Sequence, residues 1–478
     1  MGVEPIGILT LGLGFICLSM GHERGVVVFI TLTVLGSAAA ILVGSANVQP
    51  AHLFLLFLSI STFSHPKRVS MAVRALRCPQ PGFWLACLVF YGIATGYFAP
   101  RLLARMSEIV PLGAPYFPST DGISPLGPVS SNFTQAVYLS ADLLAFLLVS
   151  AIAATKSGFR AVVIGLMAFA FANAAFGLLD MVTHGTSGQD LFAFIRNAQY
   201  TFHENEEVAG IRRVVGSWPE ASALAGISLG PLGFTGTMLI CGRLRLWSSV
   251  LFATSVFLVL RSTSSAGLVA LPICLLLLYL TALSRSGAGV GKSTSNGIVL
   301  LTPLALIVAG LILALDEALY WRIYDYVDLL LFSKATSDSG LTRSAWNYYG
   351  YRNFLDSFGL GVGLGTVRTS SFLVALLANV GIPGTLFFGL FTMMSLMKKR
   401  DSVATFESDS RAASRNGCLC LLVGAFIVGP TVDLGLLFFV FAGLVSSSIQ
   451  DDPIAAPVKY QPRSLARVAA TSKDTLSS

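Results

Sequence analysis

Charged residues are scarce in this sequence. They make up 12% of the 478 residues, whereas hydrophobic residues make up 54%, and the mean hydropathy is +0.75. A water-soluble chain of this length needs far more charged surface, so the composition excludes an ordinary soluble enzyme. The apolar residues instead fall in blocks of roughly 15 to 22, the length of helix that crosses a hydrocarbon core about 30 Å thick.

We expect no cleavable signal peptide, because the first apolar block has no basic region before it and no A-x-A site after it. We expect this block to be a retained helix. The sequence predicts an all-α, polytopic membrane helical bundle of about 12 or 13 spans, forming a single integral membrane domain over residues 1–449. Segments 51–64 and 417–429 are short enough to be re-entrant. The predicted spans are 5–20, 25–45, 51–64, 83–99, 134–154, 161–183, 221–241, 246–260, 265–283, 298–315, 371–396, 417–429 and 434–449.

The basic residues predict the orientation of the spans. With the N-terminus outside and the C-terminus inside, 20 of the 31 Lys and Arg residues fall in inside segments, as the positive-inside rule requires. The net charge of +7 therefore needs no nucleic-acid partner. We expect a multi-pass protein of the bacterial inner (cytoplasmic) membrane with a disordered cytoplasmic tail at 450–478. The long outside loops, which would face the periplasm, are 100–133, 184–220 and 316–370, and the last two are expected to contain short helices.

Disulfides, metal sites and a nucleotide site are not expected. None of the seven cysteines lies in a long outside loop, and no metal cluster or other cofactor site is visible. The stretch SGAGVGKST (286–294) is similar to a phosphate-binding loop. However, Ser286 stands where the first glycine of that motif is required, and two membrane spans flank the stretch. We interpret it as a linker.

Arginine and aromatic residues are concentrated in two of the predicted outside loops. The stretch RRVVGSWPEAS (212–222) precedes a span, and loop 316–370 holds four arginines among many Tyr, Trp and Phe residues. Guanidinium groups bind phosphate oxygens in a bidentate manner, and aromatic rings stack on sugars. This combination favours a ligand that contains both phosphate and sugar groups, such as a lipid-linked glycan. An interfacial aromatic belt with arginine anchors is the alternative. The glycines of GLGVGLG (359–365) can adopt positive φ and let backbone N–H groups face an anion.

Three stretches resemble the O-antigen polymerase and O-antigen ligase superfamily of membrane glycosyltransferases. They are RRVVGSWPEAS (212–222), RSTSSAGLVAL (261–271), and TRSAWNYYGYRNFLDSFGLGVGLGTVRTSS (342–371) followed by LLANVGIPGTLFF (376–388). The resemblance implies transfer of glycans from undecaprenyl pyrophosphate, in contact with membrane lipid and with a chain-length regulator or export complex as a possible partner. It implies no cofactor. The substrate-binding residues it points to are Arg212, Arg213, Trp218, Arg261, Arg343, Trp346, Arg352, Gly363 and Arg368.

Two departures favour a polymerase over a ligase. Ligases of this family carry a histidine just after the glycine turn, but no histidine follows His203 here. They also carry an arginine at the Ser-rich helix start, where this chain has Ser265 or Ala266. We therefore expect a polymerase that joins lipid-linked repeat units into an exopolysaccharide, a capsule or an O-antigen.

Three acidic residues are candidates for function. Glu220 and Asp356 could be the catalytic base that activates an acceptor hydroxyl. Glu220 could instead stabilise a helix N-terminus, and Asp356 could pair with an arginine. Asp142, in the middle of a predicted span, is either functional or neutral and hydrogen-bonded within the bundle.

Two other classes of protein remain open. A transporter or flippase would also be polytopic, but its binding groups should lie near midplane, commonly in repeated halves, and no internal repeat is visible. A structural assembly partner would have no need for convergent arginines. Arg→Lys substitution at Arg213, Arg343 and Arg352 separates an enzyme from a scaffold, because lysine lacks the bidentate geometry.

Overall fold

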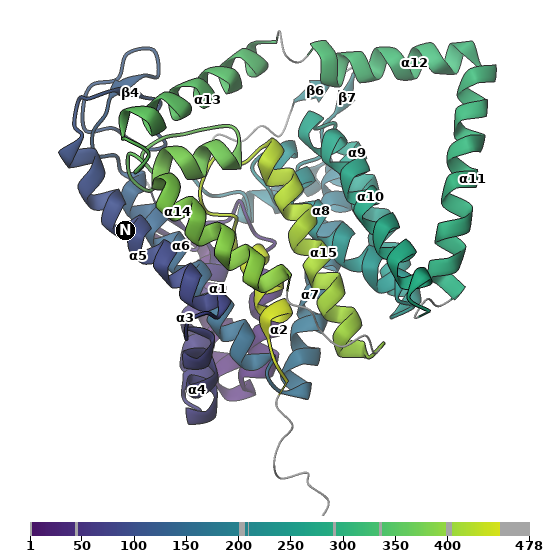
Figure 1. Ribbon diagram of the computed structural model, residues 1–478, viewed down its shortest axis with the longest axis horizontal. Coiled ribbons are helices and arrows are strands. Elements are labelled where there is room, and N and C mark those ends of the chain that lie inside the picture. Colours follow the sequence, from purple (N-terminus) through teal and green to yellow (C-terminus); the bar gives the residue numbers. More distant parts are fainter. Residues whose placement is uncertain are drawn as a thin grey trace, which may run out of the picture.

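The computed structural model describes residues 2–43, 46–199, 206–208, 210–289, 293–333, 337–397 and 404–449. In this part of the chain, seven helices are long and apolar enough to cross a membrane. The protein is therefore an all-α, multi-pass membrane protein (Figure 1). The seven helices are α5 (Pro81–Leu102), α6 (Ser131–Ile152), α7 (Lys156–Thr183), α8 (Ala221–Ile240), α10 (Ser265–Gly287), α11 (Ser293–Leu315) and α14 (Phe372–Leu396).

Each of the other predicted spans also contains a helix. Three are shorter apolar helices, α1 (Pro5–Met20), α3 (Pro50–Phe63) and α16 (Leu436–Ser446). The remaining three are α2 (His22–Leu32), α9 (Arg245–Arg261) and α15 (Phe406–Ile427). The predicted tail at 450–478 and part of the linker at 286–294 lie outside the described residues.

The prediction of a helix over 25–45 is wrong in its second half, because α2 ends at Leu32. The hydroxyl of Thr33 donates to the Ile30 carbonyl at 2.6 Å, and the backbone then bonds to a distant segment. Ser37 N–H donates to the Ser217 carbonyl at 3.1 Å, and Ala39 N–H donates to Asn197 Oδ1 at 2.9 Å. The apolar run continues as strand β2 (Ile41–Val43), which pairs with β1 (Gly2–Val3) and β3 (Ala46–Val48).

The predicted span at 417–429 begins too late, because α15 starts at Phe406. Its polar first turns are stabilised by partners at the same end of the bundle. The buried Asp409 carboxylate accepts from Arg243 Nε and from Arg285 Nη2, both at 2.8 Å. Thr405 Oγ1 caps the helix by accepting from the Ser408 N–H. After α15, residues 428–435 run without regular structure before α16 begins.

Phenylalanines fill the contact between α6, α14 and α16. Phe391 lies 5.4 Å from Phe146 and 5.8 Å from Phe439, measured between ring centroids, and all three rings are fully buried. Small residues let other helices approach closely. A Cβ at Gly233 of α8 would lie 2.6 Å from the Asn416 carbonyl oxygen of α15. Glycine at such a position permits the tight helix packing typical of membrane bundles.

The predicted outside loops contain short elements. Loop 100–133 carries β4 (Glu108–Ile109) and β5 (Ser124–Pro125), and loop 184–220 carries the 3-10 helix η1 (Ser187–Phe194) and the strands β6 (Glu207–Val208) and β7 (Ile211–Arg212). Loop 316–370 is mostly helical, with α12 (Glu317–Val327), the π-helix η2 (Asp328–Phe332) and α13 (Asp338–Asp356). Helix α13 lies across one end of the bundle, on the same side as β6 and β7 (Figure 1).

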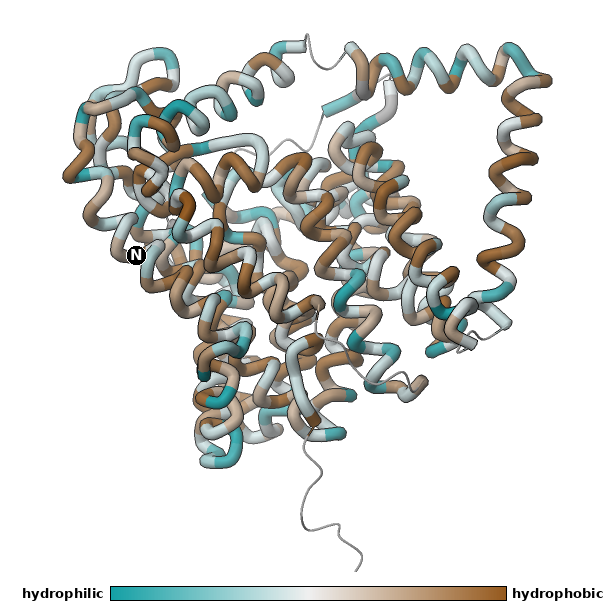
Figure 2. Tube along the Cα trace, in the orientation of Figure 1, coloured by the Kyte–Doolittle hydropathy of each residue, from teal (hydrophilic) through white to brown (hydrophobic). Residues whose placement is uncertain are grey.

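Helix α11 stands apart from the rest (Figure 1). None of its most apolar window is buried inside the protein, although the mean hydropathy of that window is 2.8. Figure 2 shows apolar residues along its whole length, whereas α13 carries many hydrophilic ones. In a bilayer, a helix that is apolar all round can expose this surface to lipid without cost.

Candidate functional site

A buried carboxylate organises the RRVVG stretch. Asp180, in the last turn of α7, accepts from Arg196 Nη2 at 2.8 Å and from Arg212 Nη2 at 3.3 Å. The same carboxylate accepts from the N–H groups of Val215 at 2.9 Å and Gly216 at 3.1 Å. Its side chain is only 1% exposed. Asp180 therefore anchors the chain that leads into α8, a role that the sequence analysis missed although an acid ending an apolar span was a visible signal.

The stretches 212–222 and 261–271 lie together. Arg261 Nη1 donates to the Arg212 carbonyl at 2.7 Å, and Arg213 Nε donates to the Ser262 carbonyl at 3.2 Å. Arg213 also pairs with Glu206, with 2.6 Å between Nη1 and Oε2. We call Arg212, Arg213 and Arg261 the first arginine group.

Trp218 and Glu220 lie where the chain enters α8. The Trp218 indole donates to Asn173 Oδ1 of α7 at 3.1 Å, and its ring covers Gly36, where a Cβ would come within 2.2 Å of it. The bundle thus contacts both the indole N–H and the six-membered ring of this side chain. Glu220 is the N-cap residue of α8, and its carboxylate accepts from the Ser222 hydroxyl.

A second group of residues forms on α13 and after it. The Arg368 guanidinium lies 4.9 Å from the centroid of the Trp346 ring, a cation–π contact. Arg343 precedes Trp346 by three positions and is half-buried on the same face of α13. We call Arg343, Trp346 and Arg368 the second group.

Arg352 does not belong to this face of α13. It follows Arg343 by nine positions, which is about two and a half helical turns, so the two side chains leave opposite sides of the helix. The burial pattern agrees, because Gly350 and Asn353 are buried whereas Arg352 is exposed. Asp356, the last residue of α13, is half-buried, and no described residue forms an ion pair with it.

The glycine turn has the predicted conformation but not the predicted role. Its four glycines all have positive φ, between 77° and 110°. Five of its seven N–H groups, including that of Gly363, bond within the protein and so are not available to an anion. Gly361 N–H donates to Ser357 Oγ at 3.0 Å, Val362 N–H donates to the Ala378 carbonyl at 2.8 Å, and Gly363 N–H donates to the Asn379 carbonyl at 3.0 Å. A Cβ at Gly363 would lie 2.7 Å from the Thr95 carbonyl oxygen, so this glycine permits close packing on α5.

Loop 100–133 supports the residues around Arg368. Arg368 N–H donates to the Val110 carbonyl at 2.9 Å, and Leu112 N–H donates to the Thr366 carbonyl at 3.2 Å. Within α14, the buried Asn379 side chain accepts from the Val367 N–H and donates to the Val367 carbonyl, both at 3.1 Å. These contacts hold the backbone that carries Arg368 in one position.

The two groups differ in charge balance. Both lie at the same end of the bundle (Figure 1). Arg212 and Arg213 each have an acidic partner. Among the described residues, Arg343, Arg352 and Arg368 have none. Their positive charge is therefore available to an anion from outside the chain.

Asp142 is buried at 1% exposure within α6, and its Oδ2 atom has no hydrogen-bond partner among the described residues. Its carboxyl interacts with that of Asp433, on the irregular segment before α16. Asp433 also lies near His52 of α3, whose ring is 4.9 Å from that of Tyr138.

No family model matches the chain, and no curated protein is significantly similar to it in sequence. Within the described residues, no three His, Cys, Asp or Glu side chains are grouped so that they could hold a metal ion.

Proposed function

We propose that this protein is a membrane glycosyltransferase that polymerises undecaprenyl-pyrophosphate-linked oligosaccharide repeat units. The observation that supports this proposal is the charge and arrangement of the residues in the second group. Arg343 and Arg368 have no acidic partner among the described residues. Arg368 lies against the Trp346 ring, and Arg343 is on the face of α13 that carries this ring, at the end that our topology predicts to be external. A pyrophosphate joined to a sugar has the matching chemistry, because guanidinium binds its oxygens and the indole binds a sugar face.

The proposed reaction is a single displacement. An acceptor sugar hydroxyl attacks the anomeric carbon of the donor, a new glycosidic bond forms, and the bond to undecaprenyl pyrophosphate breaks. The departing pyrophosphate takes the bonding electron pair. Fixed arginines that bind this growing charge more strongly in the transition state lower the barrier.

The hydroxyl proton leaves to a base. Glu220 and Asp356 are the candidates, because each is a half-buried carboxylate without an ion-pair partner in the part of the chain that the structure describes. Glu220 lies beside the first arginine group in sequence, and Asp356 ends the helix that carries the second group.

The first arginine group supports the same reaction from a different position. Arg261 has no acidic partner in the described segments, whereas Arg212 and Arg213 are held in place by Asp180 and Glu206. A guanidinium that already pairs with a carboxylate can still donate from its remaining N–H groups. We therefore assign Arg212 and Arg213 to positioning and Arg261 to ligand contact.

Reconstitution tests the proposal. Purified protein in liposomes is supplied with undecaprenyl-pyrophosphate-linked repeat units and no nucleotide, and the glycans are separated on a gel. A ladder of products supports a polymerase. A single transfer that requires a lipid acceptor indicates a ligase instead. With folded protein and the correct repeat, the absence of any new glycosidic bond contradicts both enzymes and leaves a transporter.

A further inference from the structure

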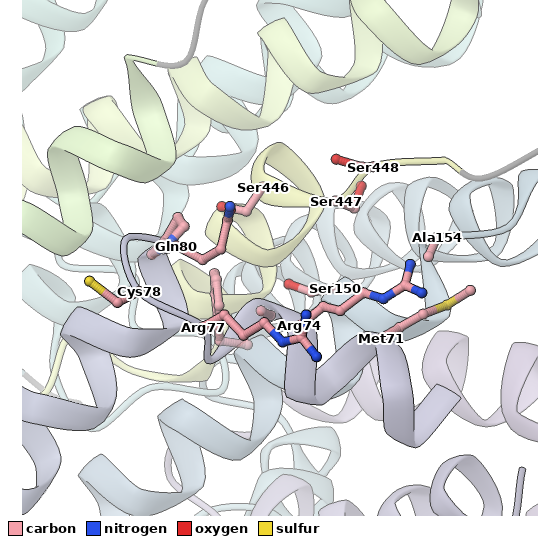
Figure 3. Close-up of a pocket in the computed structure, with 13 residues that line it drawn as sticks. Met71, Arg74, Arg77, Cys78, Gln80, Ser150, Ala154, Ser446, Ser447 and Ser448 are labelled. Carbon is pink, nitrogen blue, oxygen red and sulfur yellow. The ribbon is translucent and has the colours of Figure 1, made fainter. Parts of the chain in front are cut away.

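A cavity of about 420 Å³ lies beside the helix that precedes α5, and Figure 1 shows this helix at the end of the bundle opposite α13. It is bordered by α4 (Pro66–Ala75), the start of α5 and the ends of α6 and α16. Arg74 and Arg77 line it from one side, and Ser446, Ser447 and Ser448 line it from the other (Figure 3). Two guanidinium groups thus line one cavity.

The polar groups of this cavity are available to a ligand. Neither Arg74 nor Arg77 has an ion pair or a side-chain hydrogen bond with any described residue, and both are exposed. The Ser446 hydroxyl is buried and has no hydrogen-bond partner in the described part of the chain. A buried hydroxyl without a partner destabilises the protein, and a ligand that bonds to it would remove that cost.

The local charge favours an anion. Helices α4, α6 and α16 end at the cavity and α5 begins there, so the partial charges of these four helix termini sum to roughly −1 elementary charge at most. The two guanidinium groups more than offset this, which leaves a net positive charge of about one. The cavity therefore fits a singly charged phosphate.

An apolar cavity of about 400 Å³ adjoins the first one and shares Gln80 and Pro81 with it. Its other lining includes Met393, Met394 and Met397, at the end of α14. Methionine side chains are flexible and polarisable, and they suit irregular apolar ligands such as acyl chains. A cationic space next to an apolar one is the arrangement that an amphiphile requires.

We propose that these two cavities bind one anionic phospholipid. Its phosphate lies between Arg74 and Arg77 with Ser446 as a donor, and the first part of an acyl chain lies along the three methionines. Basic pockets between membrane helices bind anionic headgroups in this way. The site is distinct from the arginine groups at the other end of the bundle, and it does not depend on the proposed reaction.

Lipid titration followed by native mass spectrometry tests the site. Delipidated protein in detergent is titrated with phosphatidylglycerol and, separately, with zwitterionic phosphatidylcholine. We expect phosphatidylglycerol to bind at least about tenfold more tightly than phosphatidylcholine, and R74Q/R77Q to lose at least that factor, since one charged hydrogen bond to the phosphate contributes about tenfold or more in affinity. The control K67Q/R160Q removes the same charge from two exposed residues that line neither cavity, and it should bind normally.

A second comparison separates a lipid from a free phosphate. Glycerol phosphate should compete weakly, and M393Q/M397Q should weaken phosphatidylglycerol binding while the protein stays monodisperse. Glycerol phosphate binding as tightly as the lipid, or no effect of M393Q/M397Q, would overturn a lipid in favour of a soluble phosphate. Equal loss in R74Q/R77Q and K67Q/R160Q would overturn the site altogether, because it would show only a general effect of charge.

Discussion

Gly361 and Gly381 pack directly against each other. A Cβ at Gly361 would lie 2.6 Å from the Gly381 nitrogen, and a Cβ at Gly381 would lie 2.3 Å from the Leu360 carbonyl carbon. Gly381 has φ 61° and ψ −164°, so helix α14 is interrupted there. Ile382 N–H, displaced from the helical ladder, donates to the Gly359 carbonyl at 2.8 Å. The glycine turn and the break in α14 therefore stabilise each other.

Replacing Gly381 with Ala should destabilise the protein. The new Cβ would meet backbone atoms, and alanine at positive φ is strained by about 1–3 kcal/mol before any clash is added. We expect G381A to lower the temperature of thermal unfolding in detergent by several degrees. The matched control is G389A in the same helix, where a Cβ meets nothing within 4 Å. Alanine is favoured over glycine inside a helix, so equal melting of G381A and G389A would contradict the mutual packing.

The helices were predictable because an apolar block long enough to cross a membrane is a strong sequence signal for a helix. A helix lies in each predicted span. The break at Gly381 was not predictable, since it depends on contacts with a turn some twenty residues earlier. The same limit explains the glycine turn. Its positive φ follows from glycine alone, but the partners of its N–H groups are set by α14. Likewise, spacing in the sequence cannot show that Arg352 faces away from Arg343 until α13 is known to be a helix that buries Gly350.

Arg343 should matter more than Arg352 for glycan transfer. Arg343 shares the inner face of α13 with Trp346, while Arg352 is on the exposed face. In the reconstituted assay, we expect R343K to lower kcat by at least about tenfold, because lysine cannot form a bidentate bond to phosphate. R352K serves as the matched control and should keep most activity. A larger loss of kcat in R352K than in R343K would place the ligand on the exposed face of α13. It would contradict our assignment of ligand binding to the second group.

Asp180 should be essential for folding around the first arginine group. D180N leaves the buried Arg196 and the half-buried Arg212 without their shared carboxylate. Removing one partner of a buried ion pair costs about 3–5 kcal/mol. We expect a large loss of thermal stability and of folded protein. The control is D190N, an exposed acid on η1 nearby, which should melt like the wild type. Normal melting of D180N would show that the segment 212–216 is held by other contacts.

The catalytic base can be assigned by separating turnover from stability. Removing a general base lowers kcat by about 10²–10⁴. E220Q also weakens the favourable interaction of a carboxylate with the N-terminus of α8, which contributes about 0.3–1 kcal/mol to stability and nothing to turnover by itself. We expect either E220Q or D356N, but not both, to lose kcat at least a hundredfold with KM nearly unchanged. At whichever residue is the base, the conservative variant, E220D or D356E, should have a higher kcat than the amide variant. If both amide variants turn over normally, neither carboxylate accepts the proton, and the attacking hydroxyl must lose it directly to water or to the departing pyrophosphate.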